Sequence, residues 1–183
     1  MLETERLRLD RVRQQDMPFL HALSHLEAVR CWMSPALPQQ LEALWRRLAE
    51  KEDGDALHLP RVITDKAQAR PVGVIAFQHY AAAHHAQIVF ALHPDHWHRG
   101  YMQEALACMI TYGFASGLRR ISAYCAQENT ASIHVLEQIG FGLEGTLRRH
   151  ARLADGRCHD VRLYSLNEEE WRSRHEKRTG GQI

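Results

Sequence analysis

The chain has little of what marks several large classes of protein. Its 183 residues include four cysteines, and no two of them stand at C-x-x-C spacing. A zinc knuckle or a redox pair of cysteines is therefore not expected. The formal net charge is only +1, which gives no sign of a nucleic-acid-binding surface or an acidic tail. No apolar run is long enough to span a bilayer.

The first residues also lack the apolar stretch of a signal peptide, because charged side chains occur within the first few positions. We therefore expect a reduced, cytoplasmic protein that binds neither membrane nor nucleic acid. The composition that remains, 45% hydrophobic and 25% charged, is ordinary for a globular protein. The length suits one domain over residues 1–183, with 171–183 as the end of a C-terminal helix and a polar tail.

Hydrophobic patterns along the chain predict an alternation of strands and helices. Strands are predicted, from period-two alternation or short apolar runs, over residues 6–12, 57–64, 71–80, 87–92 and 121–125. Helices are predicted, from apolar spacing and stop signals, near residues 17–23 and 41–48, from 102 to Gly117, and over 130–139. Residues 51–55 read as a charged turn, and Asp155-Gly156 as a hairpin turn between 143–153 and 158–166. The mixed order predicts one α/β or α+β domain.

A glycine stands between a predicted strand and a predicted helix in the segment 93–106. Gly100 would let backbone N–H groups converge on an anion at the start of the helix. A single glycine is a poor fingerprint by itself, because Gly100 could serve only a turn, with Trp97 in the core. A dinucleotide site would need G-x-G-x-x-G and an acid about 20 residues further on, so we set that reading aside.

A second segment makes the pattern more specific. Residues 127–133 read Gln-Glu-Asn-Thr-Ala-Ser-Ile, and residues 138–141 read Gln-Ile-Gly-Phe. Together with 93–106, they resemble the GCN5-related N-acetyltransferases (GNAT), and within them the Rim-type branch that acetylates ribosomal-protein N-termini. Similar stretches at 2–9, 71–75, 142–145 and 155–161 extend the resemblance over nearly the whole chain. It implies a mixed, mostly antiparallel central sheet, flanked by helices and splayed at the cofactor site.

The resemblance also implies a cofactor, acetyl-coenzyme A, as co-substrate. In the family a loop of pattern Q/R-x-x-G-x-G/A binds its pyrophosphate through backbone amides. Here Gly100 fills the central glycine, while Trp97 and Met102 depart from the pattern. Asn129 matches the asparagine that binds the pantetheine arm, although it could simply cap a helix. The cofactor-binding residues so implied are Leu92, His98, Arg99 (with extra cationic help), Gly100, Tyr101, Met102 and Asn129.

The proton donor to the departing thiolate differs from the usual family residue. The tyrosine found in much of the family falls at Leu136, which cannot donate a proton. In the Rim-type branch a serine that matches Ser132 takes over this role. A serine at this point in a helix could also simply pack or bond the preceding turn. Ser132 is therefore the candidate catalytic acid.

The general base is less well marked. The usual glutamate falls at Gln87, which cannot accept a proton. The Rim-type branch can place an acid near Ala151, and the neighbouring His150 belongs to the residue type that titrates near neutral pH. Other candidates are Glu144, His159 and Asp160, and each could equally be an ordinary surface residue of the hairpin.

The expected activity is direct acetyl transfer to a primary amine, most simply a protein N-terminal α-amine. Such an amine has a pKa of about 7.7–8.0, so roughly a tenth is neutral at pH 7, whereas lysine at about 10.4 is far less reactive. Amides of the splayed strand would polarise the thioester carbonyl. A small-molecule amine, such as a polyamine or an antibiotic, is an alternative acceptor. A non-catalytic acyl-coenzyme A-binding module is the alternative from another class, and a homodimer is left open.

The thirteen histidines raise the question of a metal site. His93, His96 and His98 could supply three zinc ligands. They fall in the loop expected to hold pyrophosphate, and no carboxylate or cysteine joins them at fixed spacing. No metal is therefore expected. His84, His85 and the basic stretch 172–178 read as solvated surface.

Overall fold

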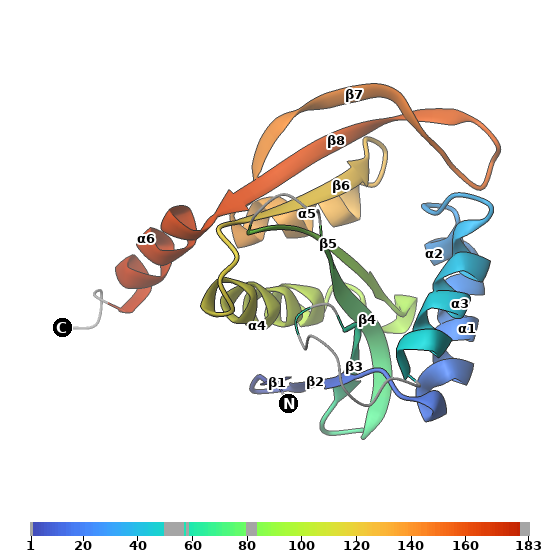
Figure 1. Cartoon of the computed structure of the whole chain (residues 1–183), viewed down its shortest axis with the longest axis horizontal. Helices are drawn as coiled ribbons and strands as arrows, with labels where there is room; N and C mark the ends of the chain where they lie inside the picture. The colour runs from blue at the N-terminus through green and yellow to red at the C-terminus, as the bar shows by residue number, and fades with distance from the viewer. Residues whose placement is uncertain (1, 50–56, 58, 80–83, 180–183) are drawn as a thin grey trace.

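The computed structural model describes residues 2–49, 57, 59–79 and 84–179 (Figure 1). Eight strands form one sheet in the order β1-β2-β3-β4-β5-β6-β8-β7, and every neighbouring pair is antiparallel except β5 and β6. The strands are β1 (Leu2–Glu3), β2 (Leu7–Arg11), β3 (Arg61–Asp65), β4 (Arg70–His79), β5 (His85–Leu92), β6 (Arg120–Ala126), β7 (Gly142–Arg152) and β8 (Cys158–Asn167). This mixed, mostly antiparallel sheet confirms the predicted fold class.

In the part of the chain that the structure describes, α-helices and short 3-10 turns lie between the strands, and one further helix follows the last strand. The helices are α1 (Met17–His25), α2 (Glu27–Arg30), α3 (Leu37–Ala49), α4 (Tyr101–Ala115), α5 (Thr130–Ile139) and α6 (Glu168–Thr179), with 3-10 turns at Gln14–Asp16 and Pro94–His96. Figure 1 shows α1, α2 and α3 gathered on one side of the molecule, and α4 and α5 on the other side of the central strands.

Alternate side chains of the central strands bury on opposite faces. Ile63 and Ile75 belong to the larger core, which includes the apolar face of α4. Val62 and Val74, one residue earlier on the same strands, belong to a second core with α1 and α3. Because both faces are covered, the apolar residues of these strands form nearly continuous runs, as the sequence has them.

One strand begins later than predicted. The apolar run from residue 57 predicted a strand over 57–64, but β3 begins at Arg61. Leu57 and Leu59 are buried, so the apolar signal was real. Pro60 has no N–H to give to a ladder, and its carbonyl instead accepts a hydrogen bond from the N–H of Val12 at 3.0 Å. The charged turn predicted at 51–55 lies outside the described residues.

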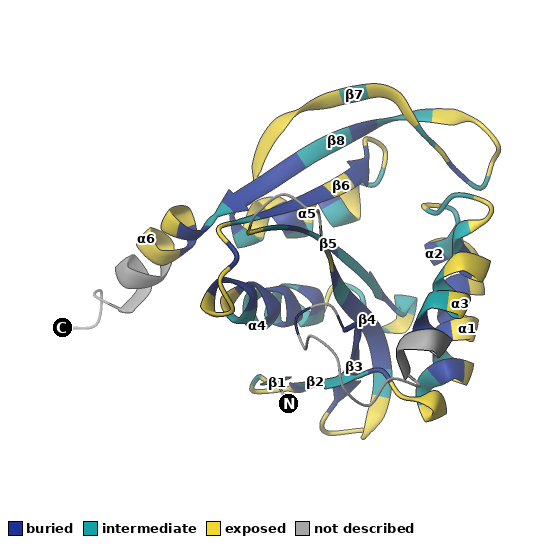
Figure 2. Ribbon diagram, in the orientation of Figure 1, coloured by how far each residue is buried: buried dark blue, intermediate teal, exposed yellow. Residues whose placement is uncertain are grey.

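The C-terminal hairpin is the most exposed part of the sheet. Figure 2 shows β7 largely exposed, whereas β8 beside it is buried over much of its length. Gly156 has φ 77° in the predicted Asp155-Gly156 turn. The ladder shifts register between Leu147 and Ala151, where Arg149 has φ 51° and donates its N–H to Asp160 at 2.7 Å. This bulge sets the direction in which His150 leaves the strand.

Of the two neighbouring histidines predicted to lie at the surface, one is exposed and the other is half-buried. His84 is exposed, as predicted. His85 is half-buried, and its Nε2 lies 3.0 Å from the Ser122 hydroxyl. It is the parallel pairing of β5 with β6 that covers this ring, which the sequence pattern did not reveal. Among the described helices, none is long and apolar enough to cross a membrane.

Candidate active site

The parallel strands β5 and β6 separate after three residues. They pair only at His85 with Arg120, Ala86 with Ile121, and Gln87 with Ser122. Beyond Gln87, β5 continues to Leu92 and stays paired with β4 only. A cleft of about 740 Å³ opens here, and its walls include β5, the end of β6, and the first turns of α4 and α5. The backbone groups of β5 that face β6 are thereby available to a ligand.

The start of α4 forms one end of this cleft. Gly100 stands at its N-cap with φ 74°, and His98 also has a positive φ of 58°. The first N–H groups of a helix have no carbonyl partner within it, so they present donors and a positive dipole to an anion. Met102 is buried on the core side of the helix, so its backbone rather than its side chain is the feature useful to a ligand.

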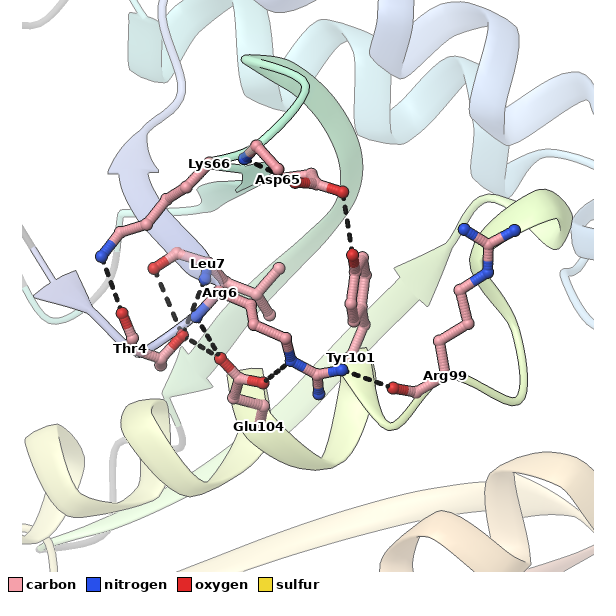
Figure 3. Close-up of polar contacts among 9 residues, drawn as sticks. Thr4, Arg6, Leu7, Asp65, Lys66, Arg99, Tyr101 and Glu104 are labelled. Atoms are coloured by element: carbon pink, nitrogen blue, oxygen red, sulfur yellow. Dashed lines mark hydrogen bonds and ion pairs between the residues drawn. The ribbon is translucent and has the colours of Figure 1, made fainter.

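A polar network holds this loop to the first strands (Figure 3). The Arg6 guanidinium donates to Glu104 at 2.6 Å and to the Arg99 carbonyl at 2.9 Å. The Tyr101 hydroxyl donates to Asp65 on β3 at 2.8 Å. Thr4 also donates to Glu104. Burial raises the pKa of the Glu104 carboxyl, but the hydrogen bonds from Thr4 and Arg6 outweigh it, so the pKa is lowered. The network therefore fixes the loop before any ligand arrives.

Trp97 has a role that the family's glutamine or arginine could not fill in the same way. Its indole N–H donates to the Leu92 carbonyl at 2.8 Å, which ties the loop to the end of β5. The ring packs against both cores. Trp97 therefore packs against the core and also lines the cleft.

The start of α5 also lines the cleft. Asn129 caps the helix, since its Oδ1 accepts the N–H of Ser132 at 3.1 Å. Both residues line the cleft. The Ser132 hydroxyl lies beside the buried Cys125 thiol, whose pKa is raised to about 11 by burial although the bond with Ser132 lowers it. A thiol with so high a pKa is almost wholly protonated near neutral pH, so Cys125 is poorly suited to act as a nucleophile.

His150 lies close to the splay. Its ring stacks on that of Tyr124 with centroids 6.2 Å apart. A recess of about 340 Å³ contains His150 and Tyr124 and shares Trp32, Gln87 and Cys125 with the main cleft. The hairpin bulge thus brings His150 near residues that line the main cleft. Its role as a base stays a prediction.

The other predicted acids and bases make different contacts. Glu144 bonds the Ser165 hydroxyl and, at 3.0 Å, Arg120, and these interactions lower its pKa. Asp160 accepts the Arg149 N–H, as described above. His159 lies 3.0 Å from Asp155 and 3.4 Å from Glu128. Glu144 and Asp160 therefore make these contacts with residues that do not line the cleft.

The predicted cofactor residues fall into two groups. Those that line the cleft are Leu92, His98, Gly100, Tyr101, Met102 and Asn129. Arg99 is exposed, and its carbonyl is engaged by Arg6. The loop histidines are spread out: the rings of His93 and His96 are 6.2 Å apart, and His96 stacks on Tyr101.

Several residues of the site carried no recognisable sequence signal. Arg6 and Glu104 are far apart in the chain but adjacent in space. Trp32, exposed by 37%, is a large apolar side chain that lines both cavities. In the sequence, the only feature that could have pointed to Trp32 is its large aromatic side chain. No local sequence pattern links Arg6 to Glu104.

The chain is similar to known acetyltransferases in sequence and structure. The family model of the acetyltransferase (GNAT) domain matches residues 6–142. An uncharacterized N-acetyltransferase, YoaA of Bacillus subtilis (strain 168), is 29% identical over 174 residues, which cover 91% of this chain and 96% of the relative.

Solved structures share the fold. The ribosomal-protein-S5-alanine acetyltransferase from Vibrio fischeri has a TM-score of 0.77 at 21% identity, covering 92% of this chain and 97% of its own. The spermidine N-acetyltransferase from Vibrio cholerae, in complex with CoA and spermine, has a TM-score of 0.78 at 22% identity, covering 92% and 99%. The splayed sheet, the two helix starts in one cleft and the family match together establish that this chain belongs to the GNAT family and is an N-acetyltransferase.

Proposed function

We propose that this enzyme transfers acetyl from acetyl-coenzyme A to the α-amine of a protein N-terminus, as in the Rim-type branch. The observation that carries the proposal is that the starts of α4 and α5 meet the splayed β5 in one cleft. In this arrangement the pyrophosphate lies on the amides at Gly100, and the pantetheine arm runs along β5 past Asn129. The acetyl group then lies near the splay, between Ser132 and the recess that contains His150.

The reaction is a direct transfer. The neutral amine attacks the thioester carbonyl carbon, a C–N bond forms, and the C–S bond breaks. Backbone N–H groups of β5 stabilise the negative charge on the carbonyl oxygen. The Ser132 hydroxyl gives its proton to the coenzyme A thiolate and takes a proton from water in its place, and the amine proton passes through water to His150. The raised pKa of Cys125 supports this route over an acetyl-cysteine intermediate.

The lining of the cleft supports a peptide rather than a polyamine acceptor. The wall beside the splay is built from apolar side chains of α1, α2, α3 and the loop between the last two, namely Leu23, Val29, Trp32, Met33, Leu41 and Trp45. Among the described residues that line the cleft, Glu128 is the single carboxylate, and it pairs with His159 at 3.4 Å. A polycation would need several carboxylates to replace its hydration. The spermine in the Vibrio cholerae complex makes the polyamine the competing acceptor.

A peptide panel tests the proposal. Each peptide carries one lysine, has a free or a blocked N-terminus, and is compared with spermidine under continuous measurement of released coenzyme A thiol. We expect turnover with free N-termini and at least about tenfold less with blocked ones, because the lysine amine is largely protonated near neutral pH. Equal rates on free and blocked peptides, or preference for spermidine, would overturn the acceptor assignment. Acetyl-coenzyme A binding with no turnover on any amine would favour the non-catalytic module.

A further inference from the structure

Two histidines and a glutamate meet on the outer surface of α1 and α3, away from the acetyl-transfer machinery. His21 and His25 are one helical turn apart on α1, so both project from the same face. Glu42 comes from α3, which packs beside α1 (Figure 1). One ligand atom from each of the three residues lies within 4.8 Å of the others. The described residues contain no other group of this kind.

Both histidine rings approach one carboxylate oxygen, although Nδ1 of His25 also lies 2.9 Å from the His21 carbonyl oxygen and 3.2 Å from the Ser24 hydroxyl. The Nδ1 atom of His21 hydrogen-bonds Oε1 of Glu42, and Nδ1 of His25 lies 3.8 Å from the same oxygen. The two imidazole rings lie with centroids 4.3 Å apart. In a tetrahedral zinc site with bonds of about 2.0–2.1 Å, ligand atoms are about 3.4 Å from one another. Side-chain rotations that release the His25 ring from the His21 carbonyl would therefore close the set around an ion.

We propose that His21, His25 and Glu42 bind one divalent transition-metal ion, with zinc as the probe. Two imidazole nitrogens and one carboxylate oxygen are a donor set that binds zinc in proteins, with water as the fourth ligand. The ion takes the place of the hydrogen bond between His21 and Glu42, and each imidazole binds it in the neutral form. The side chains of His21 and His25 are 60% and 45% exposed, which gives an ion direct access from solvent.

The site joins two helices that form the apolar wall of the cleft. Leu23 and Ser24, between the two histidines, line the cleft from α1. Leu41, beside Glu42, lines it from α3. A bound ion would fasten α1 to α3 and reduce the freedom of this wall, whereas the phosphate-binding loop would be unaffected. The role is therefore structural support of the acceptor side, not participation in acetyl transfer.

The test is zinc titration of the full chain, freed of any affinity tag, by calorimetry. We expect one zinc ion per chain, and a rise in Tm of up to roughly 10 °C when zinc is at a hundred times its Kd. His21→Asn, His25→Asn and Glu42→Gln should each raise the Kd at least about tenfold. These positions are at the surface, so the metal-free variants should keep the wild-type circular dichroism spectrum.

Two control variants separate this site from general histidine binding. His84→Asn changes an exposed histidine with φ 63° to a residue that tolerates that conformation, and it should leave the Kd unchanged. His93→Asn reports on the loop histidines. In parallel, the imidazole NMR signals of His21 and His25 should shift on addition of zinc. No binding to the wild type, unchanged affinity in all three cluster variants, or loss of binding in His93→Asn would overturn the proposal.

Discussion

The wall of the cleft that we propose binds the cofactor, built by the starts of α4 and α5, differs in kind from the wall that we propose binds the acceptor, built by α1, α2 and α3. We call them the cofactor wall and the acceptor wall. The cofactor wall is held by directed bonds, such as those from Arg6 to Glu104 and from the Ser132 N–H to Asn129. The acceptor wall is apolar, and apart from Trp32 the residues named for it pack in the smaller of the two cores. Directed bonds position a ligand of constant chemistry, whereas an apolar wall selects by shape and can vary without loss of the fold.

The comparison also explains which wall carries a sequence motif. Backbone binding of a phosphate requires particular conformations at particular positions, and glycine or asparagine meets them. An apolar wall can be built from many combinations of leucine, methionine and tryptophan. Variants on the two walls should therefore separate cofactor binding, turnover and acceptor selection.

The largest effect is expected for Ser132→Ala on the cofactor wall. Loss of a positioned proton donor should lower kcat about 100-fold or more, with nearly unchanged Kd for acetyl-coenzyme A. Alanine is a good helix former, so α5 should remain intact. Steady-state kinetics beside calorimetry measures both quantities. Wild-type kcat would mean that water protonates the thiolate and that Ser132 only packs the helix.

Asn129 provides the companion measurement. Asn129→Ala should weaken acetyl-coenzyme A binding and also remove a helix cap worth about 1 kcal/mol. Asn129→Ser keeps a capping oxygen but loses the amide N–H donors. If Asn129→Ser retains the wild-type Tm and still binds acetyl-coenzyme A more weakly, the residue contacts the cofactor. Unchanged affinity in both variants would leave it with the capping role alone.

Gly100→Val should reduce affinity for acetyl-coenzyme A by roughly 10- to 100-fold. The Cβ has space, with Arg6 as its nearest neighbour at 3.4 Å, but φ 74° is strained for a β-branched residue. The loop must move, and the helix amides move with it. Calorimetry on the folded variant measures the change.

Gly117→Val is the matched control for Gly100→Val. Gly117 follows α4 at its opposite end and has φ 97°. No atom lies within 4 Å of the position that a Cβ would take there. The two variants should lose similar stability, but Gly117→Val should keep its affinity for the cofactor. Equal loss of affinity in both would show that general strain, and not the phosphate loop, is responsible.

Trp32→Ala should affect the acceptor wall alone. Removal of this large apolar surface should raise the acceptor KM about tenfold, with little change in acetyl-coenzyme A affinity. Leu143→Ala is the control, because Leu143 is 54% exposed on β7 and lies outside the cleft. A fall in cofactor affinity in Trp32→Ala would show that the two walls are not independent.

The smallest effect concerns the pH dependence of stability. His159 bonds Asp155 and Glu128, and these bonds raise its pKa above the ordinary value of 6.5. A raised pKa means that the folded state favours the protonated ring, so this stabilisation is complete below pH 6.5 and is lost as pH rises through the raised value.

Thermal unfolding of the wild type and of His159→Gln measures this contribution. The wild type should lose about one degree of Tm more than His159→Gln between pH 5.5 and 8.5, since exposed pairs contribute little. The same difference at low and high salt would contradict an ionic origin, because salt screens exposed charges.

Local features of the structure could be predicted from the sequence because they depend on neighbours in the chain. The bounds of α5, predicted over 130–139, agree with the structure, since Asn129 starts the helix as its N-cap and Gly140 ends it as its C-cap. The hairpin at Asp155-Gly156 and the apolar face of α4 follow from turn chemistry and helical spacing in the same way. The predicted start of β3 was wrong because hydrophobicity indicates burial, and a buried residue need not be paired in a sheet.

The sequence by itself therefore determined the family resemblance, the order of the elements and the two helix starts that we propose bind the cofactor. Only the tertiary structure decided which distant side chains meet. It brought Arg6 to Glu104, His150 to Tyr124, and Glu42 to the two histidines of α1. Such contacts depend on sheet order and helix packing, which join residues far apart in the chain, and no local spacing encodes them.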